Sequence, residues 1–227
     1  MKLVIPCAGK GTRMGGDIPK CLTLINDTSL LIRTTWNWSD VVESYVIVVS
    51  PQNENQIREH LREIPNVEYA TQPTPAGLAD AILQAEKYVK GKFIVNLGDC
   101  IFQGYFDKDT ARFDLGLGVW NTSDIDEVNK SYLVQESRIV TNVHEKPNIR
   151  KDWKDLTLNC GMGVYFLNDR VFNYIRAYRG LSGGGDFTAV IQNMIHAKEK
   201  FAPVWFTGDY FNVNTKEDVK KAERILK

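Results

Sequence analysis

A glycine-rich segment near the N-terminus has the composition of a phosphate-binding loop. It covers residues 7–16 (CAGKGTRMGG), and Pro19-Lys20 follows it closely. Glycines let the backbone approach a ligand and adopt positive φ, so that successive N–H groups can surround phosphate oxygens. Lys10, Arg13 and Lys20 add cationic side chains that suit the same oxygens. The segment therefore predicts a binding site for a polyphosphate.

Two well-known phosphate loops do not match this segment. The P-loop requires Gly-x-x-x-x-Gly-Lys-Ser/Thr, which residues 7–20 do not contain. The dinucleotide loop requires a third glycine where this chain has Met14. It also requires an acidic residue about twenty positions farther on, where residues 36–38 (WNW) stand. A dinucleotide-dependent oxidoreductase is therefore disfavoured.

A carboxylate follows one of the predicted strands. Residues 93–97 (FIVNL) are mostly apolar, as expected of a buried strand, and Asp99 comes shortly after them. In open α/β sheets, ligands bind at the carboxyl ends of the strands. Mg²⁺ prefers oxygen ligands and typically takes one or two carboxylates together with phosphates. Asp99 is accordingly predicted to bind Mg²⁺.

Predicted strands and helices alternate through the first half of the chain. Short apolar runs at residues 3–6, 45–49 and 93–97 indicate strands. Residues 78–89 repeat apolar side chains at helical spacing, and another helix is expected to be capped by Asn53. Apolar strands between amphipathic helices predict an α/β fold. We expect one Rossmann-like domain with a mixed, mostly parallel central sheet and helices on both faces.

The second half is less regular. Strands are predicted at residues 115–120, 132–136, 139–144 and 162–167. Helices are predicted at about residues 170–178, 187–197 and 216–226. Thr215 and Asp218 stand at capping-box spacing before the last helix. With neither an internal repeat nor a low-complexity linker, residues 1–227 are expected to form one domain. Nucleotide binding is assigned mainly to residues 1–110. Recognition of a second substrate, the acceptor, is assigned mainly to residues 111–227.

The overall composition excludes several classes of partner. The chain has 227 residues, and its 28 Lys and Arg balance its 28 Asp and Glu. This balance does not favour nucleic acid as the main partner. Neither an apolar run of about 20 residues, as a membrane span needs, nor a Cys-x-x-Cys pair occurs in the sequence. We therefore expect no membrane partner, no zinc, and four free thiols in a reducing cytoplasm.

The run from Ile5 to Leu22 resembles the opening motif of the sugar-phosphate nucleotidyltransferases, which are enzymes of GT-A-like α/β fold. The resemblance implies that Arg13 and Lys20 act on the transferring and leaving phosphates, with Asp99 as the third catalytic residue. It also implies that the triphosphate is bound by Ala8, Gly9, Gly11, Thr12 and Arg13, and by Asp99.

Later segments extend this resemblance over nearly the whole chain. Residues 72–81 (QPTPAGLADA) are similar to the family's base-recognition segment, in which Gln72 and Gly77 would contact a pyrimidine. Asp99 stands at the family's metal-binding position. Residues 145–147 (EKP) resemble a motif of the sugar 1-phosphate branch, and a sugar-pocket segment follows. The acceptor-binding residues implied by these segments are Glu145, Lys146, Asn159 and Gly161.

Two features depart from the family pattern. The family usually supplies a second carboxylate for the metal before the last helix, where this chain has Asn212 and Asn214. Either amide oxygen is a candidate second Mg²⁺ ligand, and the sequence does not choose between them. Leu133 stands where many sugar enzymes have a glycine against the sugar. We expect its side chain to fill part of that space.

The predicted reaction transfers a nucleoside monophosphate from a nucleoside triphosphate to a sugar 1-phosphate, giving a nucleotide sugar and pyrophosphate. A pyrimidine triphosphate is favoured, with dTTP or UTP ahead of CTP. One alternative is a cytidylyltransferase acting on phosphocholine, a phosphonate or a polyol phosphate. Another is a non-catalytic nucleotide-binding regulatory subunit, which the retention of Arg13, Lys20 and Asp99 disfavours. The identity of the acceptor and a homo-oligomeric state stay open.

Overall fold

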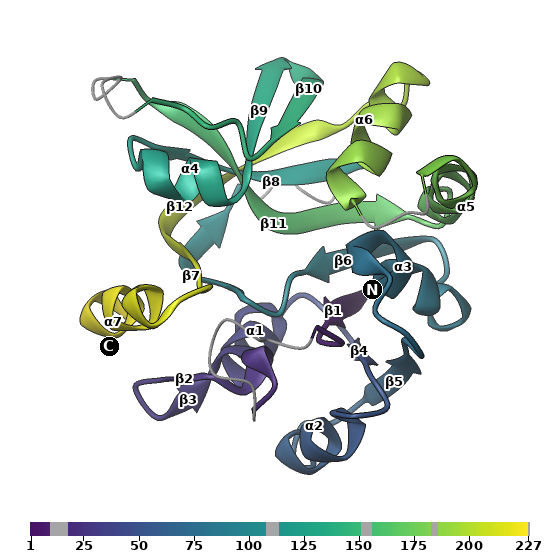
Figure 1. Cartoon of the computed structure of the whole chain (residues 1–227), viewed down its shortest axis with the longest axis vertical. Coiled ribbons are helices and arrows are strands. Elements are labelled where there is room, and N and C mark those ends of the chain that lie inside the picture. Colours follow the sequence, from purple (N-terminus) through teal and green to yellow (C-terminus); the bar gives the residue numbers. More distant parts are fainter. Residues whose placement is uncertain (10–17, 108–113, 151–155, 183–185, 227) are drawn as a thin grey trace.

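The central element of the protein is one large mixed β-sheet (Figure 1). The computed structural model describes residues 1–9, 18–107, 114–150, 156–182 and 186–226. Within these ranges the sheet has ten strands, eight of which follow the order β5-β4-β1-β6-β11-β8-β12-β7. The predicted α/β fold with a mixed sheet is confirmed.

The first half of the chain builds the parallel part of the sheet. It contains β1 (Lys2–Pro6), β4 (Ser44–Val49), β5 (Val67–Thr71) and β6 (Lys92–Asn96), each paired in parallel with its neighbours in this part. In β1, Leu3 and Ile5 contribute to the core on one face of the sheet and Val4 to the core on the other. Both faces are covered, which explains why these strands have nearly continuous apolar sequences.

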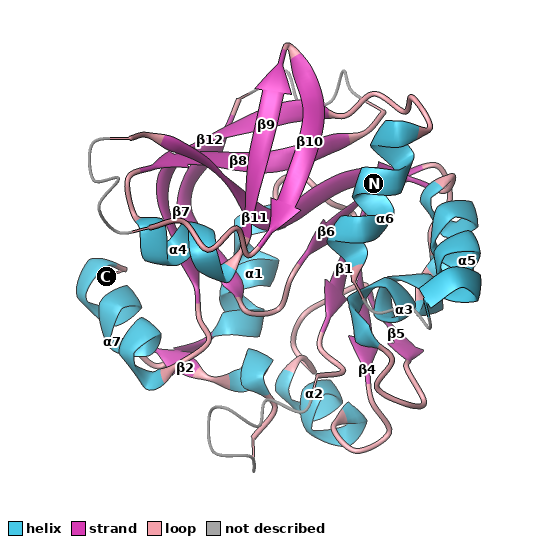
Figure 2. Cartoon of the chain, turned by 45° about the horizontal axis from the view of Figure 1, so that its top comes forward, coloured by secondary structure: helices cyan, strands magenta, loops and turns pink. Residues whose placement is uncertain are grey.

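The second half adds antiparallel strands and a protruding hairpin. Strand β11 (Leu158–Asn168) runs antiparallel to both β6 and β8 (Gly116–Thr122). The outer part of the sheet consists of β12 (Ala202–Asn212), parallel to β8 and antiparallel to β7 (Cys100–Phe106). The hairpin, which Figure 2 shows rising beside α6, comprises β9 (Tyr132–Ser137) and β10 (Ile139–Glu145).

Helices cover both faces of the sheet. Helices α1 (Leu30–Trp38) and α2 (Glu54–His60) pack on one face. The other face is covered by α3 (Gly77–Gln84), α5 (Val171–Ser182) and α6 (Phe187–His196). Two further helices, α4 (Ile125–Lys130) and α7 (Lys216–Ile225), lie beside the outer strands (Figure 1). Among the described residues, no helix is long and apolar enough to cross a membrane.

Of the two predicted helix caps, the structure contains one. The capping box of α7 is present, because Thr215 and Asp218 exchange both of its hydrogen bonds. Asn53 occupies the N-cap position of α2 but makes no side-chain cap bond, so its predicted capping role is wrong. Its side chain instead accepts from the N–H of Ser50 and donates to the carbonyl of Cys7. The N–H of Ser50 thus occupies Oδ1 of Asn53, the oxygen that would otherwise cap α2.

Candidate active site

A cavity of about 370 Å³ opens at the carboxyl ends of β1 and β6, where an open α/β sheet binds its ligands. We call it the first cavity. Five of its lining residues, Ala8, Gly9, Gln72, Gly77 and Asp99, were predicted as nucleotide contacts, and Lys20 lines it beside Asp99. It is lined by Pro6, Cys7, Ala8, Gly9, Lys20, Cys21, Gln72, Pro75, Gly77, Leu78, Ala81, Leu97, Gly98 and Asp99.

The start of the phosphate loop is held at the floor of the first cavity. The N–H of Cys7 donates to the carbonyl of Val48 at 2.7 Å, and the amide of Asn53 donates to the carbonyl of Cys7 at 2.8 Å. A side chain at position 98 would lie 2.9 Å from the carbonyl oxygen of Pro6, so only glycine fits there. The predicted contacts Gly11, Thr12 and Arg13 lie outside the described residues.

The predicted base-reading side chain is held in one orientation. Gln72 is 5% exposed and lines the first cavity. Its amide nitrogen donates to the carboxylate of Asp80 at 2.8 Å and to the carbonyl of Gly77 at 3.1 Å. Gly77 begins α3 with a φ of +85°, a conformation that glycine adopts without steric cost. Asp80 is 3% exposed and was not identified from the sequence as a functional residue.

Lys20 and Asp99 form an ion pair at the edge of the first cavity. The ammonium nitrogen of Lys20 lies 2.5 Å from Oδ2 of Asp99 and 2.8 Å from Oδ1 of Asn214. The three side chains come from the 3-10 helix η2 (Lys20–Leu22), the β6–β7 connection and the segment after β12. A hydrogen bond of 2.9 Å from the N–H of Val213 to the carbonyl of Asp99 joins the last two segments.

A bulge in β11 makes room for the connection that carries Asp99. Gly163 has a φ of +68°, and an added Cβ would lie 2.8 Å from the sulfur of Cys100. Its carbonyl accepts from the N–H of Leu97 at 3.0 Å. The register with β8 shifts at this point. Such bulges frequently lie next to active sites, where they redirect the chain.

The donor set around Lys20 fits a hard cation. It offers a carboxylate from Asp99 and an amide oxygen from Asn214, and an ammonium already lies between them. Oδ1 of Asn212, by contrast, accepts from the amide nitrogen of Asn214 at 2.6 Å. Asn214 is therefore the better placed of the two candidate amide ligands. Asp99 and Asn214 are oxygen donors of the kind that Mg²⁺ prefers.

A second cavity of about 380 Å³ adjoins the first and shares Leu78 and Leu97 with it. It combines two cations with carboxylates, hydroxyls and aromatic rings, so it suits a small polar anion. It is lined by Leu78, Leu97, Cys100, Lys130, Ser131, Tyr132, Glu145, Lys146, Gly163, Tyr165, Asp186, Phe187, Thr188 and Asn212.

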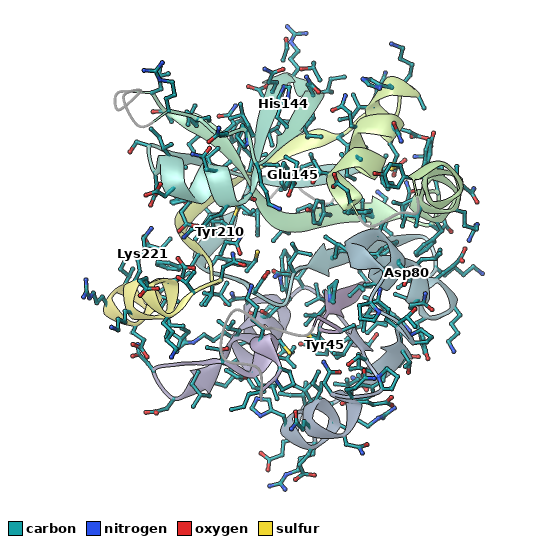
Figure 3. The ribbon with its side chains drawn as sticks, in the orientation of Figure 1. Tyr45, Asp80, His144, Glu145, Tyr210 and Lys221 are labelled. Carbon is teal, nitrogen blue, oxygen red and sulfur yellow. The ribbon has the colours of Figure 1, made fainter. Side chains whose placement is uncertain are left out.

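Glu145 and Lys146, two of the predicted acceptor contacts, line this second cavity. Figure 3 shows Glu145 at the end of β10, where the hairpin meets the rest of the sheet. Its Oε2 accepts from the hydroxyl of Thr188 at 2.7 Å. Lys146 has a φ of +43°, and its ammonium is 3.6 Å from the carboxylate of Glu145. The predicted motif is thus brought to a cavity wall together with the start of α6.

The other two predicted acceptor contacts lie elsewhere. Oδ1 of Asn159 accepts from the amide of Asn121 at 2.6 Å, on an exposed part of β11. Gly161 lies behind the ring of Tyr132, since an added Cβ would come within 2.0 Å of that ring. Neither Asn159 nor Gly161 is among the described residues that line the second cavity. Gly161 therefore acts on the cavity through the position of Tyr132.

Leu133 does not fill the second cavity as the sequence suggested. Neighbouring residues of a strand point to opposite faces, and in β9 it is Tyr132 that faces the cavity. Tyr132 is 3% exposed, and its buried hydroxyl makes no hydrogen bond in the described structure. The Tyr132 ring stacks on Tyr165 at a centroid distance of 6.1 Å. This aromatic wall, rather than Leu133, bounds the second cavity.

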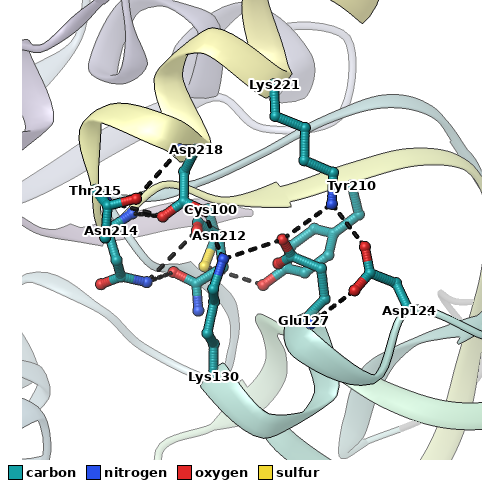
Figure 4. Close-up of polar contacts among 10 residues, drawn as sticks. All are labelled: Cys100, Asp124, Glu127, Lys130, Tyr210, Asn212, Asn214, Thr215, Asp218 and Lys221. Atoms are coloured by element: carbon teal, nitrogen blue, oxygen red, sulfur yellow. Dashed lines mark hydrogen bonds and ion pairs between the residues drawn. The ribbon is translucent and has the colours of Figure 1, made fainter. Parts of the chain in front are cut away.

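An ion network joins the second cavity to α7 (Figure 4). Lys130 hydrogen-bonds to Asp218 and lies 3.4 Å from Glu127, which is 1% exposed. Burial alone would lower the pKa of Lys130, but the hydrogen bond to Asp218 and the nearby carboxylates raise it. Asp218 also accepts from the backbone N–H groups of Asn214 and Thr215, both at 2.8 Å. The carboxylate of Asp218 therefore positions both Lys130, on the wall of the second cavity, and Asn214, the candidate metal ligand.

Two buried cysteines, Cys7 in the first cavity and Cys100 in the second, have raised thiol pKa values. A hydrogen bond to Cys21, burial and nearby charges raise the pKa of Cys7, and burial is the main cause that raises the pKa of Cys100. Both are buried, as is Cys160, and the structure contains all four cysteines as free thiols. A thiolate is the nucleophilic form of cysteine. The raised pKa values therefore make Cys7 and Cys100 unsuited to covalent catalysis.

Comparison with known proteins identifies relatives of this chain. The family model "Nucleotidyl transferase" matches residues 2–219. The bifunctional protein GlmU of Methanococcus maripaludis is 28% identical over 179 residues, covering 77% of this chain and 42% of that protein. The chain thus spans less than half the length of this curated relative.

Two solved structures share the fold. The inositol-1-phosphate CTP transferase from T. maritima has a TM-score of 0.80 at 20% identity, covering 99% of this chain and 95% of the other. A UDP-glucose pyrophosphorylase complexed with UDP-glucose has a TM-score of 0.79 at 17% identity, with 98% and 97% covered. The family match over residues 2–219 confirms the family resemblance noted at residues 5–22: the chain belongs to the nucleotidyl transferase family.

Proposed function

We propose that the protein transfers a nucleoside monophosphate from dTTP or UTP to a sugar 1-phosphate and releases pyrophosphate. The observation that carries this proposal is the pair of adjoining cavities. Predicted nucleotide contacts line the first, and the predicted acceptor contacts Glu145 and Lys146 line the second. Lys20 and Asp99 lie on the wall of the first cavity, and Asn214 connects them to Asn212 on the wall of the second.

The reaction is an in-line attack of an acceptor phosphate oxygen on the α-phosphorus, with pyrophosphate as the leaving group. The acceptor phosphate is already ionised near neutral pH, so it needs no general base. The main task of the protein is to bring two polyanions together and to stabilise the charge that develops. Lys20 neutralises the leaving phosphates from the first cavity, and Arg13 is proposed to do the same. Lys130 and Lys146 bind the acceptor phosphate in the second cavity.

Mg²⁺ is the proposed cofactor, and Asp99 and Asn214 are the residues that would hold it. When bound, it would supply positive charge against the phosphate oxygens. Asp99 is the only charged protein ligand of the proposed pair. We therefore expect the triphosphate to bring most of the ion with it.

A second candidate is cytidylyl transfer to a polyol phosphate. The structural neighbour from T. maritima is an inositol-1-phosphate CTP transferase, with a TM-score of 0.80. The second cavity, at about 380 Å³, would receive either acceptor. The sugar is preferred because Glu145-Lys146-Pro147 resembles the sugar branch, and because Glu145 offers its carboxylate to that cavity.

Pyrophosphate release tests the proposal directly. The purified chain is incubated with each nucleoside triphosphate against several sugar 1-phosphates, inositol 1-phosphate and phosphocholine. We expect the fastest release with dTTP or UTP and a sugar 1-phosphate. Glu145→Gln should raise the KM for that acceptor about tenfold or more, because it weakens hydrogen bonds to sugar hydroxyls.

The control for Glu145→Gln is Glu136→Gln, which neutralises a carboxylate on the same hairpin. It should leave the acceptor KM unchanged. Fastest release with CTP and inositol 1-phosphate would support the second candidate instead. Absence of release with every pair of substrates would contradict the proposed activity, and triphosphate binding without turnover would point to a regulatory subunit.

A further inference from the structure

The amide of Gln72 is fixed in one orientation, because both of its hydrogen-bond partners can only accept. A carboxylate and a backbone carbonyl only accept hydrogen bonds, and the amide nitrogen of a glutamine carries two N–H groups. Asp80 and Gly77 accept these two bonds at 2.8 and 3.1 Å. A flipped amide would turn its own oxygen toward both acceptors. Gln72 therefore presents its carbonyl oxygen Oε1 as the group available to a ligand.

Asp80 lies behind Gln72 rather than on the cavity wall. It is 3% exposed, occupies the first turn of α3 and is not among the described residues that line the first cavity. Figure 3 shows it on the α3 side of the sheet. Hydrogen bonds to an ionised group are roughly twice as strong as those between neutral groups. The carboxylate therefore resists a flip of Gln72 more firmly than the Gly77 carbonyl alone could.

We propose that Asp80 is a positioning residue that sets the base preference of the enzyme. It does so by making Gln72 an acceptor only. This inference rests on the proposed function, because it concerns the triphosphate that the first cavity receives. No contact between Asp80 and the ligand is required.

We place N3 of the base opposite Oε1 of Gln72, and an acceptor that faces N3 discriminates among pyrimidines. Uracil and thymine carry an N–H at N3, which can donate to Oε1 of Gln72. Cytosine has a lone pair at N3, which would face that oxygen and repel it. A free glutamine could flip and donate to cytosine instead, since its amide offers both a donor and an acceptor. With Asp80 in place the flip is blocked, so uracil or thymine nucleotides are favoured over cytosine nucleotides.

Equilibrium binding of UTP, dTTP and CTP, without an acceptor, tests this inference. The wild type should bind UTP or dTTP about 10- to 100-fold more tightly than CTP, the range expected when a buried hydrogen bond is replaced by a mismatch. Asp80→Asn keeps the side-chain volume but can either accept from or donate to Gln72. It should therefore bring the ratio of the two dissociation constants close to one.

The matched control is Glu86→Gln, which neutralises an exposed carboxylate just after α3 that pairs with Arg176. Its binding ratio should equal that of the wild type. A purely structural role of Asp80 would weaken all three nucleotides equally and leave the ratio unchanged, which would overturn the inference. So would a wild type that prefers CTP.

A chemical probe keeps the test valid if Asp80→Asn fails to fold. UTP methylated at N3 has no donor for Oε1, so the wild type should bind it about 10- to 100-fold more weakly than UTP. Equal binding of the two would also overturn the inference. Failure of the proposed transfer would appear separately, as absent pyrophosphate release with every pair of substrates, because the present test measures binding without an acceptor. Binding of UTP with an unchanged ratio in Asp80→Asn would refute the role of Asp80 alone.

Discussion

Replacement of Lys20 by methionine should tighten Mg²⁺ binding to the nucleotide-free protein while it abolishes most of the turnover. The ammonium of Lys20 lies 2.5 Å from Asp99 and 2.8 Å from Asn214. These two oxygens are the proposed protein ligands of Mg²⁺. The ammonium and the metal therefore compete for the same atoms. Methionine keeps an unbranched stem of similar length and removes the charge.

The size of the effect follows from the exposure of the ion pair. The side chains of Lys20 and Asp99 are 19% and 28% exposed, so the pair is partly shielded from water. Hydrogen bonds to charged groups typically contribute about 1.5–3 kcal/mol, whereas exposed ion pairs contribute at most about 1 kcal/mol. An intermediate value of about 1–2 kcal/mol corresponds to a 5- to 30-fold lower Kd for Mg²⁺.

Isothermal titration calorimetry with Mg²⁺ on the free protein measures this difference. Lys92→Met is the matched control, because it removes the charge of a lysine that pairs with Asp114 away from both cavities. Asp99→Asn should bind Mg²⁺ more weakly than the wild type, and Asn214→Asp should bind it more tightly. If Lys20→Met bound Mg²⁺ no better than the wild type, the proposed competition for these oxygens would be refuted.

Two further predictions concern turnover and stability. Arg13→Ala and Lys20→Ala should each lower turnover about 100- to 1,000-fold, as removal of one transition-state donor does, at an unchanged melting temperature; near-normal activity would contradict both roles. Burial alone would raise the pKa of Asp218, but hydrogen bonds from Lys130 and two backbone N–H groups lower it. The stability that Asp218 contributes is therefore present above the ordinary aspartate pKa and is lost as the pH falls through the lowered value. Chemical unfolding should show Asp218→Asn less stable by about 1 kcal/mol at pH 7, a gap that closes below about pH 3.9; a gap that persisted there would contradict the assignment.

Sequence patterns predicted three of the four strands in the parallel part of the sheet, because burial dictates their apolar sequences, and missed β5, whose residues are mostly half-buried. Strands covered on both faces need continuous apolar runs, and β1, β4 and β6 have them. Helix α1 was not predicted, because residues 30–38 (LLIRTTWNW) are rich in residues that form isolated helices poorly. Tertiary packing stabilises it, with Leu31 and Trp38 buried in the core.

The candidate site could be predicted in its motifs but not in its supporting contacts. Lys20 and Asp99 are 79 residues apart, and a family motif was needed to connect them. Asn53 reads as a helix cap in the sequence, yet it holds the carbonyl of Cys7. Asp80 reads as an ordinary first-turn acid of α3. Both roles depend on hydrogen bonds to atoms of other segments, which residue type and local spacing do not specify.

Hydrogen bonds to other segments also bear on the proposed metal site, in which Asn214 takes the place of a second carboxylate. Asn214 is held from three sides: its oxygen accepts from Lys20, its amide nitrogen donates to Asn212, and its backbone N–H donates to Asp218. A ligand fixed in this way loses little conformational entropy when it binds a cation. The neutral amide is a weaker ligand than a carboxylate, but it also attracts Lys20 less strongly. Lys20 is thereby left freer to turn from Asp99 toward the phosphates of an arriving triphosphate, where the proposed reaction needs its charge.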